Sequence, residues 1–481
     1  MPAIALLSWP LIAVAIFFAL GPGRGMIWTL LLGFLFLPED YAFDLQALPP
    51  YDKYSVISLS LILGILLTRR REEEPPELID PLVKYTISLL ILVMFAGMVV
   101  SVFDNTDVLT RPGGVVQPGN GIRELMNFAS SALILMVPFF LARRWLGDPE
   151  LHKEFLKAIV ILAVLYSFPI LFERRISPQL HRWIYGIEPD AFLQHVRSGG
   201  FRPMVFLTHG LVVGYFLFSA VLAAVGLVRA TTGKERMIYG LAGVWIFLIL
   251  ILSRNTGALL LAIVFAPALA FLSRGMLLWI MTAVVALYLA YPAVQQARLI
   301  PNDKLVSIIE SWSADRAQSI EFRFDNEEGL LARALEKPVF GWGGWGRSRV
   351  FDQWGNDVSV TDGVWIIQLG RFGWVGYLSY FGLLTLPLLL LWRRKAIPPA
   401  TMALAIMTTA NMVYLIPNST LGVMAWMIGG MTVGFLQYAW RREQETVPDQ
   451  DAAAEARSLG YSRFPKGPSQ QSSSYRRNLS R

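Results

Sequence analysis

Two polar stretches of the 481-residue chain concentrate side chains that could bind phosphate. Residues 173–202 carry five arginines and three acidic residues, and residues 295–361 carry six arginines, two lysines and ten acidic residues. Arginine is favoured where an anion must be held in a fixed geometry, because its guanidinium group can donate two parallel hydrogen bonds. The alternative is that these arginines pair with the nearby carboxylates on a solvated surface. The eleven arginines of the two stretches are Arg174, Arg175, Arg182, Arg197, Arg202, Arg298, Arg316, Arg323, Arg333, Arg347 and Arg349.

Other kinds of chemistry have little support in the sequence. The absence of cysteine excludes disulfides, thiolate nucleophiles and cysteine-based metal sites. The four histidines, at positions 152, 181, 195 and 209, are scattered, which argues against a metal site. Residues 341–346 spell G-x-G-x-x-G, but no strand pattern precedes them, so they do not indicate a dinucleotide site. The net charge of +7 comes from basic residues beside apolar runs and does not indicate nucleic-acid binding.

Glycine and tryptophan alternate in the segment Pro338–Gly346. Glycines let backbone N–H groups approach a ligand closely, and tryptophan faces suit sugar rings, so the segment could bind a glycan or a phosphate. A tight turn that places tryptophan at the membrane interface explains the same residues equally well.

Three polar residues stand at or inside apolar runs and have two interpretations each. Asp362 precedes a long apolar run and could be a helix N-cap or a catalytic base. Arg371 lies further along the same run, where an arginine must face the protein interior or water, in either a functional or a structural role. His209 could line a cavity or pack between helices.

Apolar residues make up 54% of the chain and charged residues only 16%, which is typical of a membrane protein. The apolar runs predict an all-α polytopic membrane protein with about 13 transmembrane helices. Basic clusters at 69–71, 143–144, 234–236, 393–395 and 441–442 fall on one side of an alternating topology, which predicts a cytoplasmic side. The predicted spans are 3–20, 26–38, 54–68, 84–103, 124–142, 154–172, 203–228, 237–252, 256–272, 276–294, 363–392, 399–416 and 420–439.

These spans divide the chain into a transmembrane catalytic domain, residues 1–440, and a polar tail, residues 441–481. We expect the tail to be disordered and cytoplasmic. Long extracytoplasmic loops are expected at about 173–202 and 295–361, with an amphipathic helix from Arg316 to Leu335. The first apolar run is interpreted as a retained span, because it lacks a basic leader and a cleavage signature.

Three stretches, in the same order along the chain, are similar to sequence motifs of a known family. Leu252–Leu259 is similar to an S-R-x-x-x-A-L start of a span. The region from Arg323 through Ala334-Leu335 to Pro338–Gly343 is similar to an arginine, Ala-Leu, P-x-x-G-x-G order, and Asp362–Gly376 is similar to H-N-x-Y-L followed by two glycines. Together they resemble the O-antigen ligase and Wzy-type polysaccharide polymerase superfamily of bacterial inner membranes. Arg197–Pro203 also looks like that family's arginine-bearing start of a span, and the likeness covers roughly residues 195–440.

The resemblance implies a metal-independent glycosyltransferase with a C-type membrane fold and no cofactor. Its donor would be a polyprenyl-diphosphate-linked glycan at the periplasmic face. Carried over to this sequence, Asp362 would accept the proton of the acceptor hydroxyl and Arg323 would stabilise the leaving diphosphate. Arg197, Arg202 and Arg254 would bind the same diphosphate, and the further candidates are His209, Arg347 and Arg371.

Asp362 and Gly363 stand where the family's ligases have histidine and asparagine, which favours a polymerase. The alternatives are an O-antigen ligase or a protein O-oligosaccharyltransferase with the same donor, and a lipid-linked glycan transporter. A transporter would be expected to show repeated halves, and the sequence shows no such repeat. The implied partners are a glycan donor and acceptor, membrane lipids, and polysaccharide export and chain-length proteins, with no nucleic acid.

Overall fold

The computed structural model describes residues 1–44, 49–68, 80–188, 195–197, 200–311, 314–344 and 346–445. The predicted basic cluster 69–71 and the predicted tail beyond Glu445 lie outside them. The described chain is mostly helical, with two short antiparallel strand pairs. Its elements are α1 (Pro2–Phe36), α2 (Lys53–Thr68), α3 (Pro81–Phe103), β1 (Leu109–Thr110), β2 (Val116–Gln117), α4 (Ile122–Trp145), α5 (Pro149–Ile176), α6 (Leu180–Tyr185), β3 (Val196–Arg197), β4 (Gly200–Phe201), α7 (Gly210–Ala230), α8 (Gly233–Leu252), α9 (Thr256–Phe271), α10 (Arg274–Gln296), α11 (Asn302–Glu310), α12 (Ala314–Leu335), α13 (Val364–Leu390), α14 (Pro399–Tyr414) and α15 (Val423–Glu445).

Eight of the described helices are long and apolar enough to cross a membrane: α1, α3, α4, α5, α7, α8, α10 and α13. Large apolar side chains on the outer helices are exposed, among them Leu89 and Leu92 on α3 and Leu241 and Val244 on α8. Such faces suit contact with lipid, and a helix satisfies its own backbone hydrogen bonds in a bilayer. The chain is therefore an all-α, membrane-embedded protein.

α1 combines two of the predicted spans in one helical hairpin. Gly21 interrupts the helix with φ 75° and ψ 172°, a conformation that glycine adopts easily. Beyond it the chain runs back on itself, because Gly25 packs against Phe17 and Gly33 against Trp9. The helix boundary therefore differs from the prediction, while the two apolar runs remain distinct.

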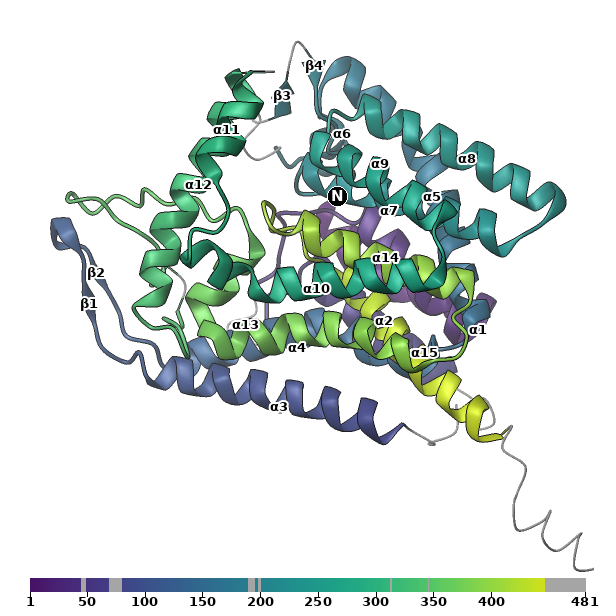
Figure 1. The fold of residues 1–481 in the computed structure, drawn as a ribbon, viewed down its shortest axis with the longest axis horizontal. Coiled ribbons are helices and arrows are strands. Elements are labelled where there is room, and N and C mark those ends of the chain that lie inside the picture. Colours follow the sequence, from purple (N-terminus) through teal and green to yellow (C-terminus); the bar gives the residue numbers. More distant parts are fainter. Residues whose placement is uncertain are drawn as a thin grey trace, which may run out of the picture.

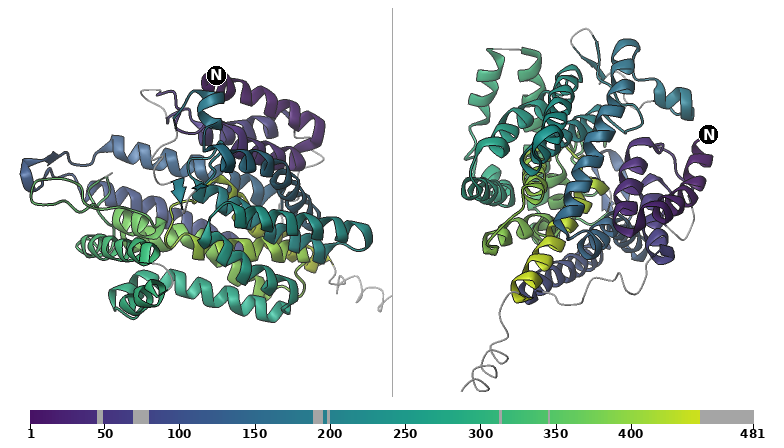
Figure 2. Two further views of the ribbon diagram at one scale, coloured as in Figure 1. Left: turned by 90° about the horizontal axis from the view of Figure 1, so that it is seen from above. Right: turned by 90° about the vertical axis from the view of Figure 1, so that its right-hand side faces the viewer.

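The buried core is built around α7 and α13. α7 packs against α5, α8, α9 and α14, and α13 packs against α3, α10, α12 and α15. In the most apolar 18-residue stretch of each helix, 78% of the residues of α7 are buried, compared with 17% of those of α8. Figure 2 shows α1 and α2 on one flank of the bundle and α10, α11 and α12 on the opposite flank.

The two ends of the bundle differ in character. At one end, here called the basic end, buried Arg394 pairs with Asp80 and Glu443, and Arg274 donates to the backbone of Arg394. The opposite end, here called the outer end, carries α11, α12 and the β1–β2 pair (Figure 1). The predicted amphipathic helix is confirmed as α12, and it brings the candidate arginine Arg323 to the outer end.

Candidate functional site

Arg323 and Asp362 meet at the outer end, where α12 lies against the start of α13. The Arg323 Nε atom lies 3.1 Å from Asp362 Oδ2, and about a third of each side chain is exposed. Asp362 is not the N-cap of α13, because Gly363 takes that position. Burial raises the pKa of the Asp362 carboxyl, and the charge of Arg323 opposes this rise. The pair thus joins a guanidinium group to a carboxylate that solvent can still reach.

Tyr414, the last residue of α14, links this pair to a second arginine. Its hydroxyl donates to the Leu211 carbonyl at the start of α7, at 2.8 Å. The alkyl chain of Arg202 packs against Gly210, the neighbour of Leu211. The loop after α14 also holds the start of α13, since the Val364 N–H donates to the Asn418 carbonyl. Two arginines that are far apart in the sequence therefore share one neighbourhood.

Arg202 and Arg254 both border the β3–β4 pair. The guanidinium group of Arg254 lies so close to Gly200 that a Cβ there would come within 2.8 Å of Nη2. The Arg202 backbone N–H donates to the His195 carbonyl, and its alkyl chain packs against Gly210. Arg254 has φ 59°, an uncommon conformation for a residue other than glycine. The side chain of Arg197, another candidate, lies outside what the structure describes.

Buried charged groups fix the turn between Arg202 and α7. Glu173, which is fully buried, accepts the backbone N–H groups of Met204 and Val205 at 2.9 and 2.7 Å. Lys53 donates to the Phe206 carbonyl and forms a buried ion pair of 3.0 Å with Glu39. Neither Glu173 nor Lys53 was predicted from the sequence, although each is a charged residue directly beside an apolar run.

His209 has a structural role in this region. It is the N-cap of α7, where its Nδ1 accepts the Leu211 N–H at 3.0 Å. Its ring centroid lies 4.5 Å from that of buried His195. The histidine pair therefore borders Arg202 and helps to fix the start of α7.

The glycine and tryptophan segment is part of the packing of α13. α13 is broken at Gly373, which has φ 61° and ψ −164°. The Trp342 and Gly343 N–H groups donate to the carbonyls of Gly370 and Arg371 just before this break. The Gly344 N–H donates to Asn120 Oδ1. Because these N–H groups are occupied, the structure favours the turn interpretation over a phosphate site.

The side chains of Arg371 and Arg347 have different neighbours from the side chain of Arg323. The Arg371 guanidinium group lies over the Phe128 ring, with Cζ 4.4 Å from its centroid. Arg347 is 2% exposed and donates to the Pro118 carbonyl at 2.9 Å. These contacts connect Arg371 of α13 to α4, and Arg347 to the loop before α4. They support structural roles.

Four other predicted arginines form ion pairs. Those of Arg182 and Arg298 lie on the surface, as the alternative interpretation expected, and those of Arg333 and Arg349 are partly buried. The pairs are Arg182 with Glu188, Arg298 with Glu328, Arg333 with Glu336, and Arg349 with Asp357. Arg174 instead donates a hydrogen bond to the Leu252 carbonyl at the end of α8.

Glu327, one helical turn after Arg323 on α12, is a site residue that was not predicted from the sequence. It is 8% exposed, and its Oε2 lies 3.5 Å from the Tyr291 hydroxyl. Burial raises its pKa to about 7, helped by the charge of Asp362 and opposed by that of Arg323. Its spacing of four residues from Arg323 was the available signal. Among the described residues, no three His, Asp or Glu side chains are arranged to hold a metal ion.

Chemically, the candidate site has guanidinium groups from three segments of the chain and a half-buried carboxylate paired with one of them. Such an arrangement can hold a phosphorylated ligand and accept a proton beside it. No family model matches the chain, and no curated protein or solved structure matches it either. Its function is therefore argued from the site and from the sequence.

Proposed function

We propose that the protein is a membrane glycosyltransferase that polymerises polyprenyl-diphosphate-linked oligosaccharide repeat units. The observation that carries the proposal is the Arg323–Asp362 pair at the outer end, where Tyr414 and Arg202 both contact the start of α7. Arginines gathered at one end of a lipid-facing bundle suit a ligand with a lipid tail and an anionic head. A carboxylate next to them suits removal of a proton during transfer.

In the proposed reaction, a hydroxyl oxygen of the acceptor glycan attacks the anomeric carbon of the donor. The bond from that carbon to the diphosphate oxygen breaks, and polyprenyl diphosphate leaves. Arg202, Arg254 and Arg323 stabilise the negative charge that grows on the diphosphate. Asp362 accepts the proton of the attacking hydroxyl, a contribution of about 10²–10⁴-fold to the rate.

The thirteen-span topology belongs to the same proposal. It counts the hairpin α1 twice and includes α2, α9, α14 and α15, which are shorter or less apolar than the eight long helices. With this count the outer end faces the periplasm and the basic end faces the cytoplasm, in a bacterial inner membrane. The basic residues at one end support this orientation.

A polymerase is preferred to the alternatives for two reasons. Asp362 and Gly363 differ from the histidine and asparagine of the ligases that the sequence resembles. The candidate polar groups gather at one end of the bundle, whereas a transporter would need them along a path through the membrane. A ligase or a protein transferase would use the same donor site with a different acceptor.

The donor site can be tested by binding of polyprenyl diphosphate to the protein in lipid nanodiscs, with the monophosphate as a comparison ligand. We expect Arg202→Gln, Arg254→Gln and Arg323→Gln each to weaken diphosphate binding about tenfold, because each removes a charge-assisted hydrogen bond. Arg349→Gln is the matched control, since Arg349 pairs with Asp357 and Ser359 in the same long loop. Equal affinity in all four variants would remove the diphosphate site.

A further inference from the structure

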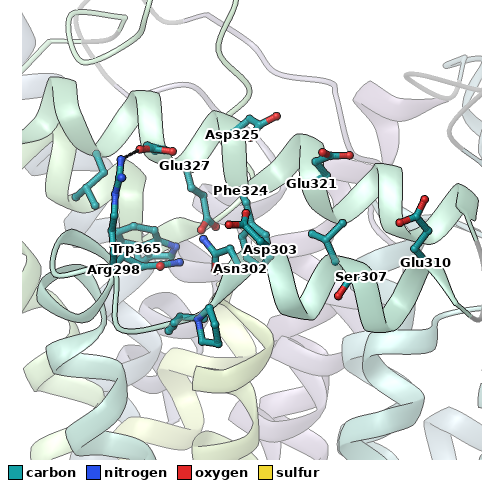
Figure 3. Close-up of a pocket in the computed structure, with 16 residues that line it drawn as sticks. Arg298, Asn302, Asp303, Ser307, Glu310, Glu321, Phe324, Asp325, Glu327 and Trp365 are labelled. Atoms are coloured by element: carbon teal, nitrogen blue, oxygen red, sulfur yellow. Dashed lines mark hydrogen bonds and ion pairs between the residues drawn. The ribbon is translucent and has the colours of Figure 1, made fainter.

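A cavity of about 480 Å³ opens between the end of α10, α11 and α12, next to the candidate site. Figure 3 shows α11 and α12 side by side, with Glu327, Asn302 and Asp303 between them and Trp365 close to Glu327. The volume falls within the usual range of small-molecule sites. Neither the sequence motifs nor the proposed donor site accounts for this cavity.

The charge of the cavity wall is opposite to that of the donor site. Its single arginine, Arg298, is already paired with Glu328. Carboxylates at this density repel an anionic ligand and accept hydrogen bonds from hydroxyl and ammonium groups. The carboxylates are Asp303, Glu310, Glu321, Asp325, Glu327 and Glu328.

Aromatic groups give the cavity a second, independent feature. Phe324 and Trp365 line it, and Trp365 is completely buried from solvent. The indole Nε1 of Trp365 faces Glu327 but makes no hydrogen bond of ordinary geometry within the described chain. Glu327 is the acceptor that this buried donor faces, so the two side chains form a buried polar part of the cavity wall. Carboxylates beside aromatic rings are well suited to bind a sugar.

Two residues of the cavity wall stand close in the chain to the Arg323–Asp362 pair. Glu327 lines the cavity one helical turn after Arg323 on α12. Trp365 lines it from the first turn of α13, three residues after Asp362. A sugar in the cavity would therefore lie near the Arg323–Asp362 pair that the proposed reaction uses.

We infer that this cavity is the acceptor subsite, and that it takes a neutral or amine-bearing sugar of the acceptor glycan. The inference rests on the proposed function. It adds that the enzyme separates its two glycan substrates by charge, with the anionic donor head at the arginines and the neutral or cationic acceptor end among carboxylates. A sugar bearing a carboxylate or phosphate is excluded from this position.

The test uses the repeat-unit oligosaccharide cleaved from its lipid diphosphate, so that the probe carries no group for the arginines. Its binding to the protein in nanodiscs is measured by saturation-transfer NMR, without donor. Trp365→Phe keeps an aromatic ring and removes the indole N–H, and Asp303→Asn with Asp325→Asn removes two charges. Glu336→Gln is the control, because Glu336 is exposed at the far end of α12 and lies outside the cavity.

We expect the wild type and Glu336→Gln to bind the probe, and the cavity variants to bind it about three- to tenfold more weakly, as expected for the loss of one hydrogen bond. Thermal melting establishes that each variant is folded. Equal binding by all variants, or no binding by a wild type that turns over donor, overturns the inference. Weakened binding in the cavity variants of a protein that never elongates the glycan would retain the subsite and refute the polymerase.

Discussion

Asp362 and Glu327 are two carboxylates that flank one arginine and have different surroundings. Asp362 pairs with Arg323 and keeps contact with solvent, whereas Glu327 is buried beside Tyr291. Arg323 and Asp362 were candidates from the sequence, because Arg323 is one of six arginines in a polar stretch and Asp362 stands at the edge of an apolar run. For Glu327 the sequence offered only its spacing from Arg323, and for Tyr414 it offered no signal, because their roles depend on helices that meet only in three dimensions.

Replacing Asp362 by asparagine should abolish glycan transfer while sparing donor binding. Asparagine keeps the shape of the side chain but cannot accept the proton of the attacking hydroxyl. In the wild type, the rate should fall as the pH is lowered through the raised pKa of Asp362, because the carboxyl must be ionised to act as a base. Turnover and donor affinity are measured in parallel.

Asp104→Asn is the control for that experiment. Asp104 pairs with Lys337, and 61% of its side chain is exposed, so the exchange changes a carboxylate outside the site. Unchanged turnover in Asp362→Asn would remove Asp362 from the mechanism.

Glu327→Gln should raise the thermal stability of the protein more at pH 8 than at pH 5. The pKa of Glu327 rises from 4.5 to about 7 on folding, so the native state binds more protons than the unfolded state between these pH values. The free energy of unfolding of the wild type therefore falls as the pH rises through this window, by about 1.4 kcal/mol for each pKa unit. Glutamine does not ionise, so the variant avoids this fall in the free energy of unfolding. Melting curves that shift equally at both pH values would contradict the buried acid.

At the scale of elements, the break in α13 depends on glycines from two segments. Gly341 has φ 70°, and a Cβ at this position would come within 2.5 Å of the Arg371 carbonyl carbon. The sequence pattern identified this segment as irregular but left its role open between a ligand loop and a turn. Only the pairing with the broken helix decides between them, because that pairing joins residues that do not follow a local pattern.

Gly341→Ala should destabilise the protein by about 2 kcal/mol or more. A left-handed backbone conformation alone costs a residue with a Cβ about 1–2 kcal/mol, and the contact with Arg371 adds to this. Gly275→Ala is the matched control, because Gly275 lies in α10 and a Cβ added there would meet no atom within 4 Å. Alanine there should be neutral or stabilising by up to about 1 kcal/mol. Similar melting temperatures for both variants would show that the break in α13 tolerates a side chain.

At the scale of the molecule, the apolar composition predicted a helical membrane protein, and the structure confirms this. The division into individual spans was harder to predict from the sequence. The two halves of the α1 hairpin follow each other with the break at Gly21 between them, and α2 and α14 are only 16 residues long. Burial in α14 comes from neighbouring helices, which hydropathy along the chain does not reveal. Packing therefore decides which apolar runs face lipid.

The orientation of the bundle can be tested with single cysteines, because the natural chain has none. Gln353→Cys at the outer end and Lys234→Cys at the basic end are both at exposed positions. In intact cells we expect a membrane-impermeant maleimide to label Gln353→Cys and to reach Lys234→Cys only after the inner membrane is opened. The reverse pattern would place the candidate site in the cytoplasm.

The most direct test of the proposed function is a reaction with the purified protein in nanodiscs and its cognate polyprenyl-diphosphate oligosaccharide as the only substrate. The donor must come from the source cell's own pathway, because a wrong sugar would give no product. We predict a ladder of products spaced by one repeat unit, with release of polyprenyl diphosphate in proportion to the bonds formed. A cognate donor that remains unextended would contradict the polymerase. Transfer that begins only when a lipid A core or a protein acceptor is added would assign the site to a ligase or a protein transferase instead.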